Sequence, residues 1–265
     1  MPKEKIIWKH KAAWLYYKEI SQKASGVIDE KYLKEYIAAK KNVRVISLGI
    51  GGGRELYWLK KFKNIKGITG VDYSERMLDI CREVAKKLKV KITLIKDNLL
   101  SLKKFERFIK KEKVPLIYIC LLNTLGNFTQ KQRERISKNI RDLMKEKDRL
   151  ILCLYKRPER IKTKISLPSQ VKVKDNSGRE IKIKEAIEYA SLEFLWPPIL
   201  QKYFQLPRFW YDDNTNNITI YIDGEKILIS HRFSREEIKN LAKAAKLKIE
   251  KIIEGKFMWI VILKA

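Results

Sequence analysis

The sequence predicts an α/β fold: a doubly wound, mostly parallel sheet of seven strands with helices on both faces. First, short runs rich in Val and Ile alternate with amphipathic helical segments from residue 43 to residue 156. Second, these runs are apolar throughout, which is typical of strands buried on both faces of a parallel sheet. Third, a glycine-rich loop follows the first run, at the edge where open parallel sheets bind ligands.

Two helices are expected before the first strand, in a helical segment of residues 1–42. The apolar residues of IIWKHKAAWLYYKEI fall roughly on one helical face. The second segment, DEKYLKEYIAAKK, has Asp29 as its N-cap.

Strands and helices then alternate along residues 43–156. The expected strands are VRVISLGI, KGITGVDY, VKITLIKDN, VPLIYICLL and DRLILCLYK. The expected helices are RELYWLKKF, SERMLDICREVAKKLK, SLKKFERFIKKEK and TQKQRERISKNIRDLMKEK. In the second of these helices, Ser74 stands at the N-terminal capping position.

Residues 157–230 interrupt this rhythm and are predicted to form an antiparallel, β-rich insertion. VKVKDNSGREIKIK and NITIYIDGEKILIS each alternate apolar and polar residues around a turn, as hairpins do. The sheet-forming pattern resumes in residues 231–265. There Ser234 and Glu237 form a capping-box pattern before a helix, and two closing strands follow.

Composition narrows the class of protein. Of the net charge of +28, +21 lies in residues 1–156, which fits either an RNA-binding surface or the Lys-rich solvated surface of heat-adapted proteins. The longest apolar run, PLIYICLL, is too short to span a bilayer, and the N-terminus lacks a signal-peptide core, so a cytoplasmic protein without a membrane partner is expected. The scattered cysteines, Cys81, Cys120 and Cys153, predict buried free thiols, and we expect no metal.

The glycine loop does not match two common nucleotide-binding patterns. A G-x-G-x-x-G dinucleotide loop needs glycine at position 54, where this chain has Arg54. The lysine of a phosphate-binding loop is missing as well. The spacing is instead Gly49-x-Gly51-x-Gly53.

In this spacing and in four further motifs, the chain resembles the class I, Rossmann-like S-adenosylmethionine-dependent methyltransferases. The motifs are VISLGIGGG, GVDYSERML, IKDNLL, ICLLNTLGNF and the closing FSREEIKNLAKAAKLKIEKI, and they cover about residues 43–156 and 233–265. The resemblance implies S-adenosylmethionine as cofactor and a methyl-transferring enzyme. The cofactor-binding residues that it implies are Gly49, Gly51, Gly53, Asp72, Tyr73, Asp97, Asn98 and Asn123.

The resemblance gives each position a role. The glycines let the loop pack against the amino-acid and ribose part of the cofactor, and Asp72 accepts hydrogen bonds from the ribose hydroxyls. Asp97 accepts from the adenine amino group, and Asn123 lies close to the sulfonium. In one place the chain departs from many relatives, because Ser47 stands where they carry an acidic residue. Glu55 or a backbone carbonyl is the expected replacement.

The methyl group is expected to go to a nitrogen or oxygen atom of a small-molecule acceptor, an amine or an amino-acid-like molecule. The insertion is nearly neutral and aromatic, and Trp210 and Tyr211 within it, with Tyr16, are the candidate acceptor-binding residues. His231 and Tyr17 are the candidate catalytic residues, since a histidine can deprotonate an acceptor near neutral pH.

Two alternative functions remain open. The first is an RNA methyltransferase that uses basic helices such as KKFERFIKKEK to bind its substrate. The second is a non-catalytic protein that only binds the cofactor or a partner. The sequence does not fix the oligomeric state.

Overall fold

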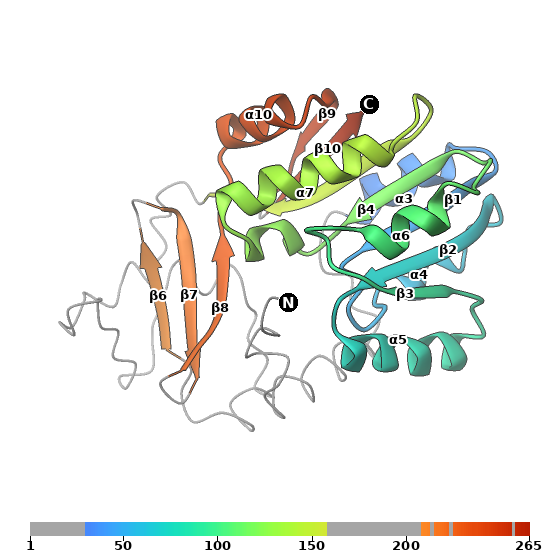
Figure 1. Cartoon of the computed structure of the whole chain (residues 1–265), viewed down its shortest axis with the longest axis horizontal. Helices are drawn as coiled ribbons and strands as arrows, with labels where there is room; N and C mark the ends of the chain where they lie inside the picture. The colour runs from blue at the N-terminus through green and yellow to red at the C-terminus, as the bar shows by residue number, and fades with distance from the viewer. Residues whose placement is uncertain (1–29, 158–207, 213–214, 223–224, 256–257) are drawn as a thin grey trace.

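The computed structural model describes residues 30–157, 208–212, 215–222, 225–255 and 258–265. Its centre is a seven-stranded sheet in the order β3-β2-β1-β4-β5-β10-β9 (Figure 1). The strands are β1 (Val43–Leu48), β2 (Ile65–Asp72), β3 (Thr93–Lys96), β4 (Leu116–Cys120), β5 (Arg149–Tyr155), β9 (Lys248–Glu254) and β10 (Met258–Lys264). The first five strands run parallel, and β10 lies antiparallel between β5 and β9. The predicted fold class is confirmed.

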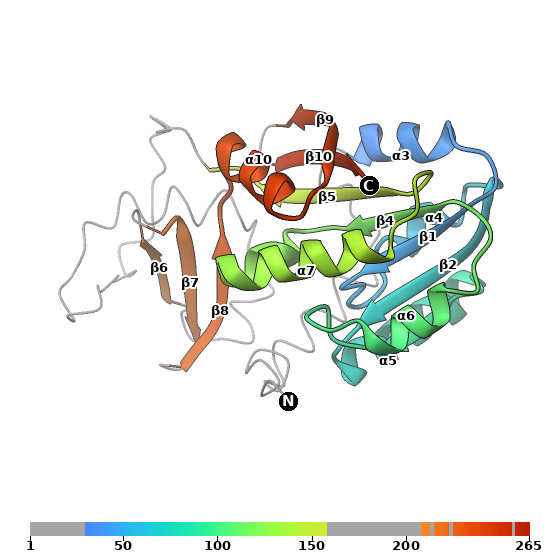
Figure 2. The same cartoon turned by 45° about the horizontal axis from the view of Figure 1, so that its top comes forward.

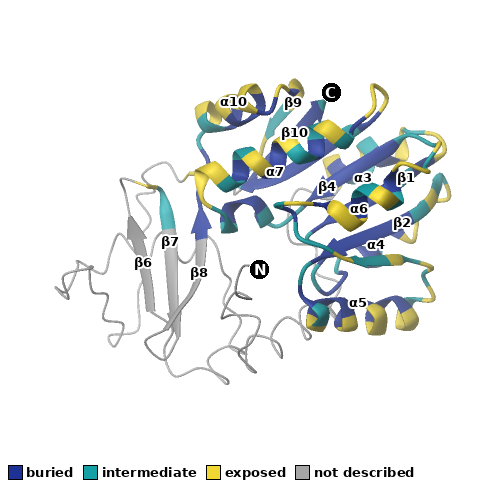
Figure 3. Ribbon diagram, viewed as in Figure 1, coloured by how far each residue is buried: buried dark blue, intermediate teal, exposed yellow. Residues whose placement is uncertain are grey.

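Helices cover both faces of this sheet (Figure 2). Those of one face are α6 (Lys103–Ile109), α7 (Gln130–Leu143) and α10 (Arg235–Ala244). Those of the other face are α3 (Glu30–Ala38), α4 (Leu56–Leu59) and α5 (Glu75–Leu88). The surface helices are buried toward the sheet and exposed on their outer sides, as amphipathic segments should be (Figure 3).

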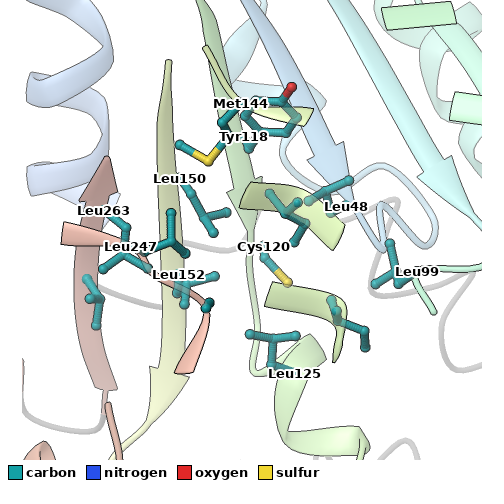
Figure 4. Packing of buried hydrophobic residues seen from close by; sticks show 14 of the residues in the cluster. Leu48, Leu99, Tyr118, Cys120, Leu125, Met144, Leu150, Leu152, Leu247 and Leu263 are labelled. Carbon is teal, nitrogen blue, oxygen red and sulfur yellow. The ribbon is translucent and has the colours of Figure 1, made fainter. Parts of the chain in front are cut away.

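Alternation along the strands builds two hydrophobic cores, one on each face. On β4, Tyr118 and Cys120 point into the core beneath α7, whereas Ile117 and Ile119 point into the core beneath α5. Figure 4 shows the first core, where Tyr118 and Cys120 lie with Leu48, Leu150 and Leu152 from the neighbouring strands. All three cysteines of the chain are buried with free thiols, as predicted.

The helix ends follow the sequence signals closely. The Ser74 hydroxyl accepts the Met77 N–H and caps α5. Ser234 and Glu237 form the predicted capping box at α10. The helix expected over residues 54–62 is shorter in the structure. Only Leu56–Leu59 is helical, and residues 51–55 form turns. The 3₁₀ turn η1 (Thr124–Asn127) was not predicted.

Part of the insertion is an antiparallel sheet of β6 (Arg208–Asp212), β7 (Asn217–Ile222) and β8 (Glu225–His231). The arrows of the parallel strands in Figure 1 point toward the side on which this smaller sheet stands. The predicted first helix, Asp29 and the hairpin VKVKDNSGREIKIK lie outside the described residues.

Candidate functional site

The candidate site begins at the carboxyl ends of β1 and β2. The sheet order changes direction between β1 and β4, which is the point where open α/β sheets bind ligands. At this point the glycine loop that follows β1 is hydrogen-bonded to β2. The N–H groups of Gly49 and Ile50 donate to the Val71 carbonyl at 2.7 and 3.1 Å, and the Gly51 N–H donates to Asp72 Oδ2 at 2.9 Å.

The three motif glycines all take left-handed backbone angles, with φ of 73°, 53° and 77° at Gly49, Gly51 and Gly53. A Cβ at Gly49 would stand 2.6 Å from Thr124 Cγ2, so glycine lets the loop approach η1 closely. Around Gly51 there is more space, because the nearest atom to a Cβ would be Met77 Cε at 3.4 Å.

Asp72 ends β2 with a buried carboxylate that is 8% exposed. Its two oxygens each accept a backbone N–H, Oδ2 from Gly51 and Oδ1 from Ser74 at 3.0 Å. Burial raises the pKa of Asp72, and these N–H donors work against that rise. The Tyr73 N–H also donates to this carboxylate. A carboxylate has about four lone-pair sites, so the three N–H donors leave it able to accept from ligand hydroxyls. Tyr73 follows directly and is half-buried.

Asp97 follows β3, and its side chain caps α6. Oδ2 accepts from the N–H groups of Lys104 and Phe105 at 2.8 and 2.9 Å, and Oδ1 accepts from Asn98 at 2.8 Å. The Asn98 side chain in turn accepts the Leu100 N–H at 3.0 Å. An adenine contact for Asp97 and Asn98 therefore stays a prediction. The geometry shows that Asp97 caps α6, whereas the Asn98 side chain closes a turn onto Leu100.

Asn123 leaves β4 in a left-handed conformation, with φ of 58° and 1% exposure. Its Nδ2 donates to Ser230 Oγ and to the His231 carbonyl, both at 3.0 Å, and its Oδ1 accepts the Tyr155 N–H at 3.0 Å. The side chain thus joins the loop after β4 to β5 and to the end of β8. The position of Asn123 near a sulfonium stays a prediction. Its hydrogen bonds show that it links the loop after β4 to β5 and β8.

His231, the candidate base, is 3% exposed and uses both ring nitrogens. Nδ1 lies 2.9 Å from Asn217 Oδ1, and Nε2 lies 3.0 Å from Glu237 Oε1. Burial of Glu237 works to raise its pKa, but the hydrogen bonds from His231 and Ser234 prevail and lower that pKa to about 2. The ring has no nitrogen left over for an acceptor, so this geometry favours a structural role at the base of the insertion.

Ser47, the departure from the resemblance, lies near the end of β1 and is 2% exposed. Its hydroxyl donates to Oε1 of Glu55, which is 6% exposed and directly precedes α4. The structure therefore brings a carboxylate to position 47 from eight residues further along the chain. Helical periodicity gave no sign that Glu55 is buried. The signal that pointed to Glu55 was the absence of an acidic residue at position 47.

Four further candidates are two tyrosines of the N-terminal segment and two aromatic residues of the insertion. Tyr16 and Tyr17 lie outside the described residues. Trp210 and Tyr211 belong to β6, where their backbones pair with Thr219 and Ile218 of β7.

Comparison with known proteins finds a matching domain family and solved structures with a similar fold. Residues 45–147, which contain the glycine loop, Asp72, Asp97 and Asn123, match the model of a family described as a methyltransferase domain. No curated protein sequence matches the chain.

In the described part of the chain, no helix is long and apolar enough to cross a membrane, and no group of three or more His, Cys, Asp or Glu residues could hold a metal ion.

Solved structures resemble the whole chain at low sequence identity. The PH0226 protein from Pyrococcus horikoshii is 17% identical, with a TM-score of 0.57, and the match covers 94% of this chain and 90% of that one. An S-adenosylmethionine-dependent methyltransferase from Clostridium acetobutylicum is 15% identical, with a TM-score of 0.58 and coverage of 96% and 97%. The CcbJ methyltransferase from Streptomyces caelestis is 16% identical, with a TM-score of 0.57 and coverage of 89% and 88%. At these identities the likeness concerns the fold.

Proposed function

This chain carries a methyltransferase domain of the class I, Rossmann-like type, and from that premise we propose that it transfers the methyl group of S-adenosylmethionine to a nitrogen or oxygen atom of a small molecule. The observation that carries the proposal is the joint geometry of the glycine loop and Asp72. A left-handed loop and a buried carboxylate at adjacent strand ends suit a nucleoside with two ribose hydroxyls.

The residues present fit the cofactor. The Asp72 carboxylate keeps acceptor capacity after receiving the N–H groups of Gly51, Tyr73 and Ser74, and it lies directly against the glycine loop. Glu55 adds a second buried carboxylate beside β1, which suits a ligand that carries positive charge. When bound, S-adenosylmethionine supplies a methyl group already activated by its sulfonium.

The chain's own residues then have to position and shield the reactants. Transfer needs an acceptor lone pair held in line with the methyl group at about 3 Å, and a site that excludes water. The hydrogen bonds of Asn123 link the loop after β4 to the C-terminal end of β8, so they hold the β4 side of the site in place. We assign positioning rather than proton abstraction to His231, because both ring nitrogens are engaged.

The small-molecule acceptor is inferred from the insertion. Residues 157–230 carry a net charge of only +2, against +21 for residues 1–156, so the insertion is poorly suited to a polyanion. This segment is also rich in aromatic residues, whose ring faces attract amine-bearing molecules. Its described part, the sheet of β6, β7 and β8, stands on the side of the parallel strands' carboxyl ends (Figure 1).

The test uses cofactor labelled in the methyl group. The full chain and an Asp72→Ala variant are each incubated with this cofactor and a cell extract, which is then separated into small metabolites, RNA and protein. We expect label among the small metabolites with the wild-type chain and much less label with the variant when the cofactor concentration is kept low. Label in RNA would show the acceptor class to be wrong, and label in no fraction would favour a non-catalytic role.

A further inference from the structure

Glu55 is a buried carboxylate for which the fold itself offers little charge compensation. In the described part of the chain it forms no ion pair, and its hydrogen-bonding partner from another element is the neutral hydroxyl of Ser47. Burial raises the pKa of Glu55 to about 6, against the hydrogen bonds from Ser47 and its own N–H and the charge of Arg54. The ionised form of a carboxylate in such a place is disfavoured unless a cation compensates it.

A second carboxylate increases this negative charge. Asp72 faces the glycine loop from β2, and its charge also works to raise the pKa of Glu55. From α5, the Cys81 thiol faces the same pair, and its pKa is raised first by burial and then by Glu55 and Asp72. Glu55 and Asp72 are the carboxylates, and the cations that act on these groups are Arg54 and Arg82, of which Arg82 is paired with Glu75 and Asp79. This end of the sheet therefore favours a ligand that brings positive charge with it.

The sheet order indicates which part of the proposed cofactor meets Glu55. Strands β3, β2, β1 and β4 are consecutive neighbours, so their carboxyl ends form one row. Asp72 ends β2, and Ser47 on β1 pairs with Gly70, two residues before Asp72. A nucleoside whose ribose is held by Asp72 can extend its amino-acid tail toward the end of β1. The α-ammonium group of that tail is a cation.

We propose that Glu55, positioned by the Ser47 hydroxyl, is the carboxylate that binds the α-ammonium group of the methyl donor. The inference rests on the proposed function and adds a specific residue to it. The carboxylate comes from the residue before α4 and reaches the end of β1 through its hydrogen bond with Ser47. Ser47 is a positioning residue, since it acts through Glu55.

Proton linkage follows from this arrangement. A bound ammonium group favours the ionised form of Glu55, so the complex holds this carboxyl deprotonated where the free protein starts to protonate it. Affinity should therefore fall as the pH falls below about 6. The ligand's own α-ammonium group, with a pKa of about 8, stays protonated over that range.

The experiment compares two neutral-sulfur nucleosides by titration calorimetry on the full-length chain. S-adenosylhomocysteine carries the α-ammonium group, and methylthioadenosine has the same adenosine without the amino-acid tail. For Glu55→Gln we expect affinity for S-adenosylhomocysteine to fall by about 10- to 100-fold, the scale of a lost charged hydrogen bond. Affinity for methylthioadenosine should change by less than about twofold, because it presents no ammonium group.

Four further measurements keep the inference distinct from a folding defect. Thermal unfolding of Glu55→Gln should be cooperative, and the acid loss of S-adenosylhomocysteine affinity should disappear in that variant. Ser47→Ala should weaken S-adenosylhomocysteine binding less than Glu55→Gln does, since the carboxylate remains. The double variant Ser47→Asp with Glu55→Gln should regain affinity, because it returns a carboxylate to the end of β1.

The outcomes separate this inference from the proposed function. A wild-type chain that binds both nucleosides, with Glu55→Gln weakening neither or both equally, overturns the role of Glu55 and leaves the proposed function standing. A wild-type chain that binds neither nucleoside overturns the proposed function itself, and the inference with it.

Discussion

The close approach of the glycine loop to η1 can be tested by filling the space between them. In Gly49→Ala the new Cβ would stand 2.6 Å from Thr124 Cγ2, at a φ of 73°. The left-handed conformation costs an alanine about 1–2 kcal/mol, and the forced contact costs about 1–3 kcal/mol more. We therefore expect the free energy of unfolding to fall by about 2–5 kcal/mol.

A second substitution separates the two costs. Thr124→Ser removes the Cγ2 methyl but keeps the hydroxyl that donates to the Leu121 carbonyl. Urea unfolding of the wild type, both single variants and the double variant gives the coupling energy. We expect the double variant to recover about 1–3 kcal/mol, the contact part alone. Effects that add to within about 0.5 kcal/mol would refute the contact between the loop and η1.

Three further predictions concern the carboxylates and His231. Asp72→Ala should weaken S-adenosylhomocysteine binding by about 1.5–3 kcal/mol, measured by calorimetry, and unchanged affinity would remove Asp72 from the site. Burial raises the pKa of Glu55 to about 6 from an ordinary value of 4.5, so the fold gains stability from protonation at low pH and loses it as pH rises through about 6. Relative to Glu55→Gln, the wild type without ligand should thus lose about 2 kcal/mol as the pH rises from about 3.5 to about 7 in urea unfolding, and a constant difference would contradict the burial of this charge. His231→Asn should lower the unfolding temperature, while the methyl-transfer rate stays above about one hundredth of the wild-type rate; a larger loss in a stably folded variant would favour general base catalysis by His231.

The architecture was predictable because its signals are local. Continuous Val- and Ile-rich runs that alternate with helices predict the strands of a parallel sheet, and Ser74 and Ser234 mark helix starts through bonds to residues three positions away. The Gly49–Gly53 spacing likewise reports a backbone requirement, which the positive φ values confirm. Local patterns of this kind do not depend on the rest of the fold.

The site side chains were harder to predict, because their partners are distant in sequence. Asn123 donates to Ser230 and to His231, more than one hundred positions away, and no periodicity reveals such a pair. Asp97 caps α6 from outside the usual N-cap position, which Leu102 occupies with a φ of 50°. Each of these polar residues matched a functional motif, whereas its described bonds hold the framework of the site together.

The most direct test of the account is a crystal structure of the chain with S-adenosylhomocysteine. The account predicts both ribose hydroxyls at about 2.6–3.2 Å from the Asp72 carboxylate, with the tail passing the Gly49–Gly53 loop toward β1. A nucleoside bound away from the carboxyl ends of β1 and β2, or one that leaves Asp72 without a ligand contact, would contradict it.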